Sequence, residues 1–178
     1  MPAARPFLIM NTKRTGTVMI FLGCILGMVV LTFFFSETEK ERYNPNRDPK
    51  SRVSAHNIEI KLERNFVGHY IANGTINRYP VAFLLDTGAT DVVVPASIAD
   101  KLNLKKGRAG RAMTANGAIT VFETNIDHLS LGEINLYNVR ASINPSMPSS
   151  NVLLGMSALG RIEFVQDGTA LTLIQKSF

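Results

Sequence analysis

The sequence has a single cysteine, Cys24, and no tryptophan. One thiol cannot form a disulfide within the chain, and it cannot build a metal site that needs several thiolates. The histidines, His56, His69 and His128, show none of the spacings at which metal ligands recur in known motifs. We therefore expect no disulfide-stapled scaffold, no metal centre and no other cofactor.

Acidic residues are missing from the first 35 positions, which carry the bases Arg5, Lys13 and Arg14. The whole chain has a formal net charge of +5, but residues 56–178 hold 11 bases and 10 acids. Since the basic excess belongs mainly to the N-terminal part, no nucleic-acid partner is indicated. The basic run at 105–111 is interpreted as a solvated loop, with contact to anionic headgroups or an acidic substrate as the alternative.

Charge of either sign is absent from Thr15 to Phe35, a stretch of 21 residues. At about 1.5 Å per residue, a helix of this length crosses the ~30 Å hydrocarbon layer of a membrane. A buried helix of a soluble protein is one alternative, and a cleavable signal peptide is another. A signal peptide has an apolar stretch of about 7–15 residues that ends in a small-x-small site. Because this stretch is longer and ends in three phenylalanines, we predict an uncleaved membrane helix over 15–35.

The flanks of this stretch predict its orientation. Three bases precede it, whereas three glutamates mixed with Lys40 and Arg42 follow it. The positive-inside bias then places residues 1–14 in the cytoplasm. We expect a single-pass inner-membrane or plasma-membrane protein whose later residues lie on the periplasmic or extracytoplasmic side. Gly23 and Gly27, four positions apart, would also let two such helices approach closely.

Residues 36–55 are polar, include two prolines and show no apolar periodicity. Such a composition predicts a solvated linker. The folded domain is expected to comprise residues 56–178.

Short strands separated by turn signals dominate this domain. Asn-Gly pairs at 73–74 and 116–117, Gly-Glu at 132–133 and Asp-Gly at 167–168 each lie between strand-like runs and predict hairpin turns. The almost wholly apolar run Tyr79–Leu85 predicts a strand buried on both faces. Helical patches are expected at 96–102 and 156–159. The pattern predicts an all-β, mostly antiparallel domain with one or two short helices and no internal repeat.

One motif stands out, Leu84-Leu85-Asp86-Thr87-Gly88-Ala89-Thr90. An ionisable residue at the end of a buried strand is costly unless it has partners or a chemical role. Gly88 allows a tight turn and close approach of another chain. An ordinary loop in which Asp86 caps a turn is the alternative interpretation for the tripeptide alone.

The surroundings of this motif resemble the active-site loop of retropepsin-like aspartic peptidases. A second element of that family, two apolar residues and a glycine before a short helix, matches Leu153, Leu154 and Gly155. Between the two elements, the hairpin with Asn116 and Gly117 at its tip lies where the family has its flap. The resemblance covers roughly residues 56–175, and the single N-terminal span is similar to bacterial membrane-anchored members. It implies a single-lobe acid-protease barrel.

The resemblance also implies an activity. Aspartic peptidases use two carboxylates that share one proton around a water. Since this chain has one Asp-Thr-Gly, it would supply half a site, and a homodimer would bring together two copies of Asp86. In the family pattern, Thr87 braces the two loops, the Gly88 carbonyl contacts the substrate, and the 111–123 hairpin closes over an extended peptide. The C-terminal strand, 170–174, would be a candidate for the dimer sheet.

Two positions depart from the retroviral pattern. Those enzymes carry an acid and an arginine where this chain has Thr90 and Met156, so the usual pair is missing as a whole. A membrane tether would compensate by raising the local concentration of two copies. A catalytically inactive peptide-binding or assembly module with the same fold is the main alternative function, and a purely structural membrane protein is the third.

Overall fold

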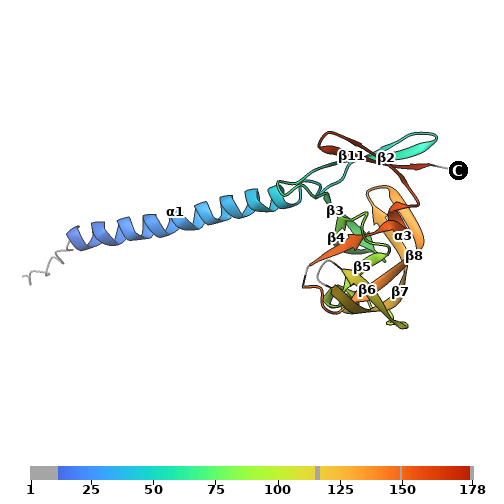
Figure 1. Ribbon diagram of the computed structural model, residues 1–178. Helices are drawn as coiled ribbons and strands as arrows, with labels where there is room; N and C mark the ends of the chain where they lie inside the picture. Colours follow the sequence, from blue (N-terminus) through green and yellow to red (C-terminus); the bar gives the residue numbers. More distant parts are fainter. Residues whose placement is uncertain (1–11, 115–116, 149, 177–178) are drawn as a thin grey trace, which may run out of the picture. The chain divides into compact units, whose positions relative to one another are not determined.

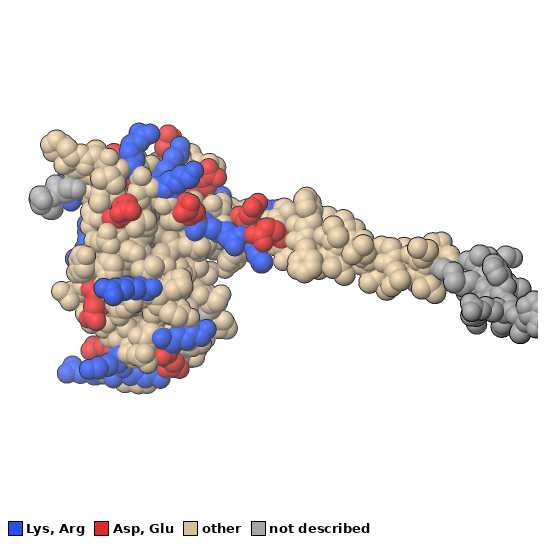
Figure 2. All heavy atoms as spheres, turned by 180° about the vertical axis from the view of Figure 1, so that it is seen from behind, with Lys and Arg blue, Asp and Glu red and all other residues tan. Residues whose placement is uncertain are grey.

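The computed structural model describes residues 12–114, 117–148 and 150–176. The chain divides into two compact units, Met1–Lys40 and Glu41–Phe178. The first described element is helix α1, Thr12–Tyr43. Its apolar side chains from Val18 to Phe35 are exposed, and Figure 2 shows a long stretch of its surface without charged residues. By length and composition, Gly16–Tyr43 could span a membrane.

The second unit consists mainly of two β-sheets (Figure 1). The four-stranded sheet has the order β1-β2-β11-β10, and the seven-stranded sheet has the order β3-β4-β9-β5-β8-β7-β6, with an added β3–β7 pairing. The pairs β4–β9 and β5–β8 are parallel, and the other strand pairs are antiparallel. The strands are β1 (Ser51–Val53), β2 (Asn57–Glu63), β3 (Ile71–Ile76), β4 (Tyr79–Leu85), β5 (Val92–Pro95), β6 (Ala109–Thr114), β7 (Gly117–Leu131), β8 (Ile134–Asn144), β9 (Asn151–Leu154), β10 (Glu163–Asp167) and β11 (Ala170–Lys176). Two short helices, α2 (Ala96–Lys101) and α3 (Met156–Leu159), complete the unit.

One apolar core joins strands of both sheets. Alternate residues of β2 and β11, such as Ile60 and Leu173, lie in the same cluster as Phe83 of β4 and Ile126 of β7. All four are fully buried. This packing confirms the predicted mostly antiparallel β-domain with short helices. The strand β4 is less buried than predicted, because only one of its faces is fully covered.

Most hairpins are confirmed, but the predicted turn at Asn73-Gly74 is wrong. Both residues lie inside β3, and the chain turns at Asn77 and Arg78, which have φ angles of 49° and 69°. A Cβ on Gly74 would overlap the carbonyl of Ser130 and lie 2.6 Å from the Phe83 ring. This glycine therefore serves close packing inside the sheet rather than a turn.

The segment predicted as a polar linker contains ordered structure. Helix α1 continues to Tyr43, Asn44 and Asn46 are buried, and Ser51–Val53 forms β1 beside β2. The second compact unit accordingly begins at Glu41 rather than near His56. These polar side chains can be buried because their hydrogen bonds are made, by Asn46 with backbone groups of β2 and β3 and by Asn44 with the Asn73 side chain and the Asn46 N–H.

Candidate active site

Strand β4 leads directly into the Asp-Thr-Gly motif. It pairs in parallel with β9, and the register places Leu85 opposite Leu154. The ladder extends one residue further, since the backbone N–H of Asp86 donates to the Leu154 carbonyl at 3.1 Å. Asp86 is thus held at the end of two adjacent core strands.

The motif turns sharply after this point. The Asp86 carboxylate Oδ1 accepts a hydrogen bond from the Gly88 N–H at 2.9 Å, and the Asp86 carbonyl accepts from Ala89 at 3.2 Å. Asp86 is half-buried, whereas Thr87, Gly88 and Thr90 are exposed. The capped turn considered from the sequence is therefore present, and it leaves the tip of the loop open to a partner or substrate.

The element at Leu153, Leu154 and Gly155, which the resemblance singled out, lies against this loop. The Met156 N–H donates to the Ala89 carbonyl at 2.8 Å, and the Ser157 N–H donates to the Thr90 carbonyl at 2.9 Å. A Cβ on Gly155 would collide with the Asp91 carbonyl and lie 2.7 Å from that of Ala89. Only glycine permits this approach, so the start of α3 and the Asp86 loop form one rigid assembly.

Three further residues brace the loop, and the sequence did not single them out. Arg140 Nε donates to Asp91 Oδ1 at 2.6 Å. Ser157 Oγ accepts from the Val92 N–H at 3.0 Å and donates to the Arg140 carbonyl at 2.7 Å. The ion pair of Arg140 with Asp91 lies within one chain and joins the loop to β8. Its only sequence signal is a second acid, five positions after Asp86.

The predicted flap corresponds to the antiparallel hairpin of β6 and β7, in which Thr114 pairs with Gly117. Gly117 has a φ of +108°, which favours glycine, and its carbonyl accepts from the Thr114 hydroxyl at 2.8 Å. Asn116 lies outside the described residues. Met113 is 83% exposed, so this hairpin carries an apolar side chain in solvent next to its tip.

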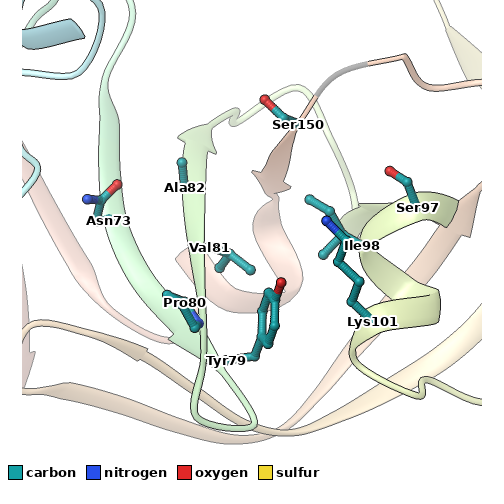
Figure 3. A pocket seen from close by; sticks show the side chains of 9 residues that line it. All are labelled: Asn73, Tyr79, Pro80, Val81, Ala82, Ser97, Ile98, Lys101 and Ser150. Carbon is teal, nitrogen blue, oxygen red and sulfur yellow. The ribbon is translucent and has the colours of Figure 1, made fainter. Parts of the chain in front are cut away.

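A pocket of about 390 Å³ lies at the other end of β4 (Figure 3). Tyr79–Ala82 of β4 and Ile98 and Lys101 of α2 contribute to its wall. Asp86 follows the far end of the same strand, so this pocket is separate from the motif. Among the described residues, no group of three or more His, Cys, Asp or Glu side chains is placed to hold a metal ion.

Comparison with known proteins gives the motif a family context. The family model of the gag-polyprotein putative aspartyl protease matches residues 72–161, which are 90 of the 178 residues. This range includes Asp86, the β6–β7 hairpin and Gly155.

Two curated relatives also match. An uncharacterized protein encoded in the cobV 5′ region of a Sinorhizobium species is 28% identical over 111 residues, which cover 61% of this chain and 48% of that protein. An uncharacterized protein of Rickettsia prowazekii (strain Madrid E) is 29% identical over 118 residues, which cover 65% of this chain and 50% of that protein. The chain spans about half the length of the curated relatives it matches.

A solved structure matches most of the chain. The crystal structure of a retropepsin-like aspartic protease from Rickettsia conorii superposes with a TM-score of 0.58 at 28% sequence identity. The match covers 72% of this chain and 97% of that one. The retropepsin-like fold expected from the motif is confirmed, and the chain belongs to the family of gag-polyprotein putative aspartyl proteases.

Proposed function

We propose that this protein is a membrane-anchored aspartic endopeptidase that acts as a homodimer and uses Asp86 from each copy. The observation that carries the proposal is the single Asp-Thr-Gly at the end of core strand β4, braced by Leu154 and Gly155. Such bracing fixes the position of a carboxylate without enclosing it, as half of a shared site requires.

The chemistry needs both copies. One Asp86 carboxylate accepts a proton from a water that attacks the scissile carbonyl, while the protonated Asp86 of the second copy donates a hydrogen bond to the carbonyl oxygen. The exposed Thr87 hydroxyl braces the two loops, and the exposed Gly88 contacts the substrate backbone. The β6–β7 hairpin closes over a peptide that lies extended, like an added strand. No cofactor takes part in this scheme.

The edge strand β10 is a better dimer surface than the C-terminal strand. Strand β11 lies between β2 and β10, so neither of its edges is open to a second copy. Strand β10 ends the four-stranded sheet and is exposed along its whole length, including Phe164 and Val165. Since an exposed apolar edge invites pairing with another chain, we assign the intermolecular contact to β10.

Anchoring and orientation complete the proposal. Residues 15–35 cross the inner or plasma membrane, with residues 1–14 in the cytoplasm and the peptidase unit outside it. Substrates are then proteins or peptides on the periplasmic or extracytoplasmic side. Two copies held in one membrane meet at a higher effective concentration, which favours a dimer of half-sites.

The decisive experiment compares Asp86→Asn with the wild-type full chain in detergent, using a peptide library with and without pepstatin. We expect kcat/KM to fall by about 100-fold or more, since a catalytic acid–base group is removed while the shape is kept. Asp100→Asn, at an exposed acid in α2, is the matched control and should keep wild-type activity. Both variants should unfold at the wild-type temperature.

Near-wild-type cleavage by purified Asp86→Asn would remove Asp86 from the mechanism. A wild-type chain that binds peptides but never cuts them would instead favour the inactive binding module with the same fold. A chain that does neither would favour the structural role.

A further inference from the structure

Asparagine side chains hold the last residue of α1 and the residues that follow it against the second compact unit's strands. We call residues 43–47 the strap. Asn44 and Asn46 of the strap are 7% and 6% exposed, and the asparagines that receive it, Asn65 and Asn151, are also buried. Burying amide side chains is unfavourable unless their hydrogen bonds are made. The partners of these clustered asparagines therefore show what holds the strap in place.

Asn46 joins the two sheets. Its Nδ2 donates to the carbonyls of Glu63 at 2.9 Å and Ile71 at 2.7 Å, and its Oδ1 accepts from the Glu63 N–H at 2.7 Å. These bonds connect the end of β2 with the start of β3. Its backbone forms a parallel bridge with Ala72, and its carbonyl accepts from the Asn73 N–H at 3.0 Å. The strap thus lies against β3 like a short added strand.

Asn73 of β3 binds the strap with its side chain. Its Oδ1 accepts from Asn44 Nδ2 at 2.8 Å, and its Nδ2 donates to the Arg47 carbonyl at 2.9 Å. Asn65 donates to the Tyr43 carbonyl at 3.0 Å. The strap is therefore bonded at both ends as well as in the middle.

The other contact of the strap reaches β9. Asn151, the first residue of β9, donates from Nδ2 to the Tyr43 hydroxyl at 2.6 Å. In the sheet register, Asn73 of β3 and Asn151 of β9 are both partners of Ala82 of β4. Figure 3 shows Asn73 and Ala82 on their neighbouring strands. The strap is bonded to both neighbours of β4 at one level, four residues before Asp86.

We propose that the strap is a positioning element of the active site, with Tyr43 and Asn151 as positioning residues. By binding β3 and β9, it fixes both strands that flank β4. The Leu154 carbonyl that holds the Asp86 N–H is the last group of the same β9. Loss of the contact between the strap and β9 lets β9 and the Asp86 loop shift together. A small misplacement of a catalytic group lowers the rate steeply. This inference rests on the proposed peptidase function.

The test uses Tyr43→Phe in the full chain, which removes the hydroxyl bonded to Asn151 and keeps the ring. We expect kcat for a fluorogenic peptide to fall about three- to tenfold, the effect of losing one partly buried hydrogen bond. We expect KM to stay within about twofold, because no group that contacts the substrate changes. Tyr137→Phe, on an exposed tyrosine of β8, is the matched control and should leave both constants unchanged.

A second readout does not depend on activity. Amide hydrogen exchange, followed by mass spectrometry, should accelerate in peptides covering 82–90 and 151–157 of Tyr43→Phe, while β7 stays at the wild-type rate. If the wild-type chain is inactive, the proposed function fails. The rate of amide hydrogen exchange at 82–90 and 151–157 then decides by itself whether the strap holds β9 and the Asp86 loop. If the wild-type chain is active, either a wild-type kcat or wild-type exchange in Tyr43→Phe overturns the positioning role.

Discussion

Gly155 occupies a point where the Asp86 loop and the start of α3 leave no space for a side chain. We expect Gly155→Ala to lower the unfolding free energy by about 2 kcal/mol, the usual effect of overpacking a rigid site. It should also lower kcat, because the added methyl group pushes on the carbonyls of Ala89 and Asp91. Chemical denaturation and peptide cleavage measure the two effects.

Gly110→Ala is the matched control for this substitution. Gly110 lies in β6, a Cβ there would meet nothing within 4 Å, and its φ is not in the left-handed region. Its unfolding free energy should stay within about 0.5 kcal/mol of the wild type. Equal stability of the two variants would show that the contact at Gly155 is not tight.

Residue-level prediction from the sequence depended on local signals. Asp86 and Gly155 were singled out because each is read from a few consecutive residues, and the structure places the two elements in contact. The ion pair of Arg140 with Asp91 was missed because its partners are 49 positions apart and neither lies in a motif. Gly74 was misread as a turn residue because the dipeptide Asn-Gly does not distinguish a hairpin turn from a strand position that needs glycine for close packing, here against Phe83.

At the scale of elements, alternation of apolar residues predicted most strands, since one face of each meets the core. It could not show that β7 runs unbroken from Gly117 to Leu131, nor that the polar strap is part of the domain. The strap has no apolar periodicity, because its binding depends on amide groups that meet distant backbone. Which strand ends a sheet also depends on long-range pairing. The structure was therefore needed to choose β10 over β11 as the proposed dimer contact.

The exposed edge of β10 leads to a cross-linking prediction. In an antiparallel pairing of two β10 strands about Val165, Glu163 would face Asp167 of the other copy, and like charges repel. A pairing about Phe164 avoids this contact and places Phe164 opposite itself. Opposed residues have Cα atoms about 4.5–5.5 Å apart, within the range of a disulfide. We expect Phe164→Cys, in a full chain that carries Cys24→Ser, to form a disulfide dimer on mild oxidation.

Arg52→Cys in the same background is the control, because β1 is the opposite edge of the same sheet. Random collisions in the membrane would link both variants, whereas the proposed dimer links only Phe164→Cys. Equal yields on a non-reducing gel would rule out β10 as the contact. Combining Phe164→Cys with Asp86→Asn keeps this result independent of catalysis.

At the scale of the whole molecule, the proposed half-site enzyme and the proposed membrane anchor suit each other. Each copy has one Asp-Thr-Gly, so the proposed active species depends on the meeting of two chains. Confinement to one membrane raises the frequency of that meeting without any added contact. In this proposal, the side of the membrane on which the chains meet determines which substrates they encounter.

The last prediction concerns that side. Arg5, Lys13 and Arg14 precede the apolar stretch with no acid among them, whereas Lys40 follows it and pairs with Glu37 at 3.5 Å. The bases further on belong to a long folded unit, and long domains cross the membrane largely regardless of charge. A reporter enzyme active only outside the cytoplasm should therefore be active when fused after Phe178 and silent when fused after Lys13. A second reporter, active only in the cytoplasm, should give the opposite pattern at both positions and so controls for expression. Activity of the second reporter after Phe178 would place the peptidase unit in the cytoplasm and make cytoplasmic proteins its substrates.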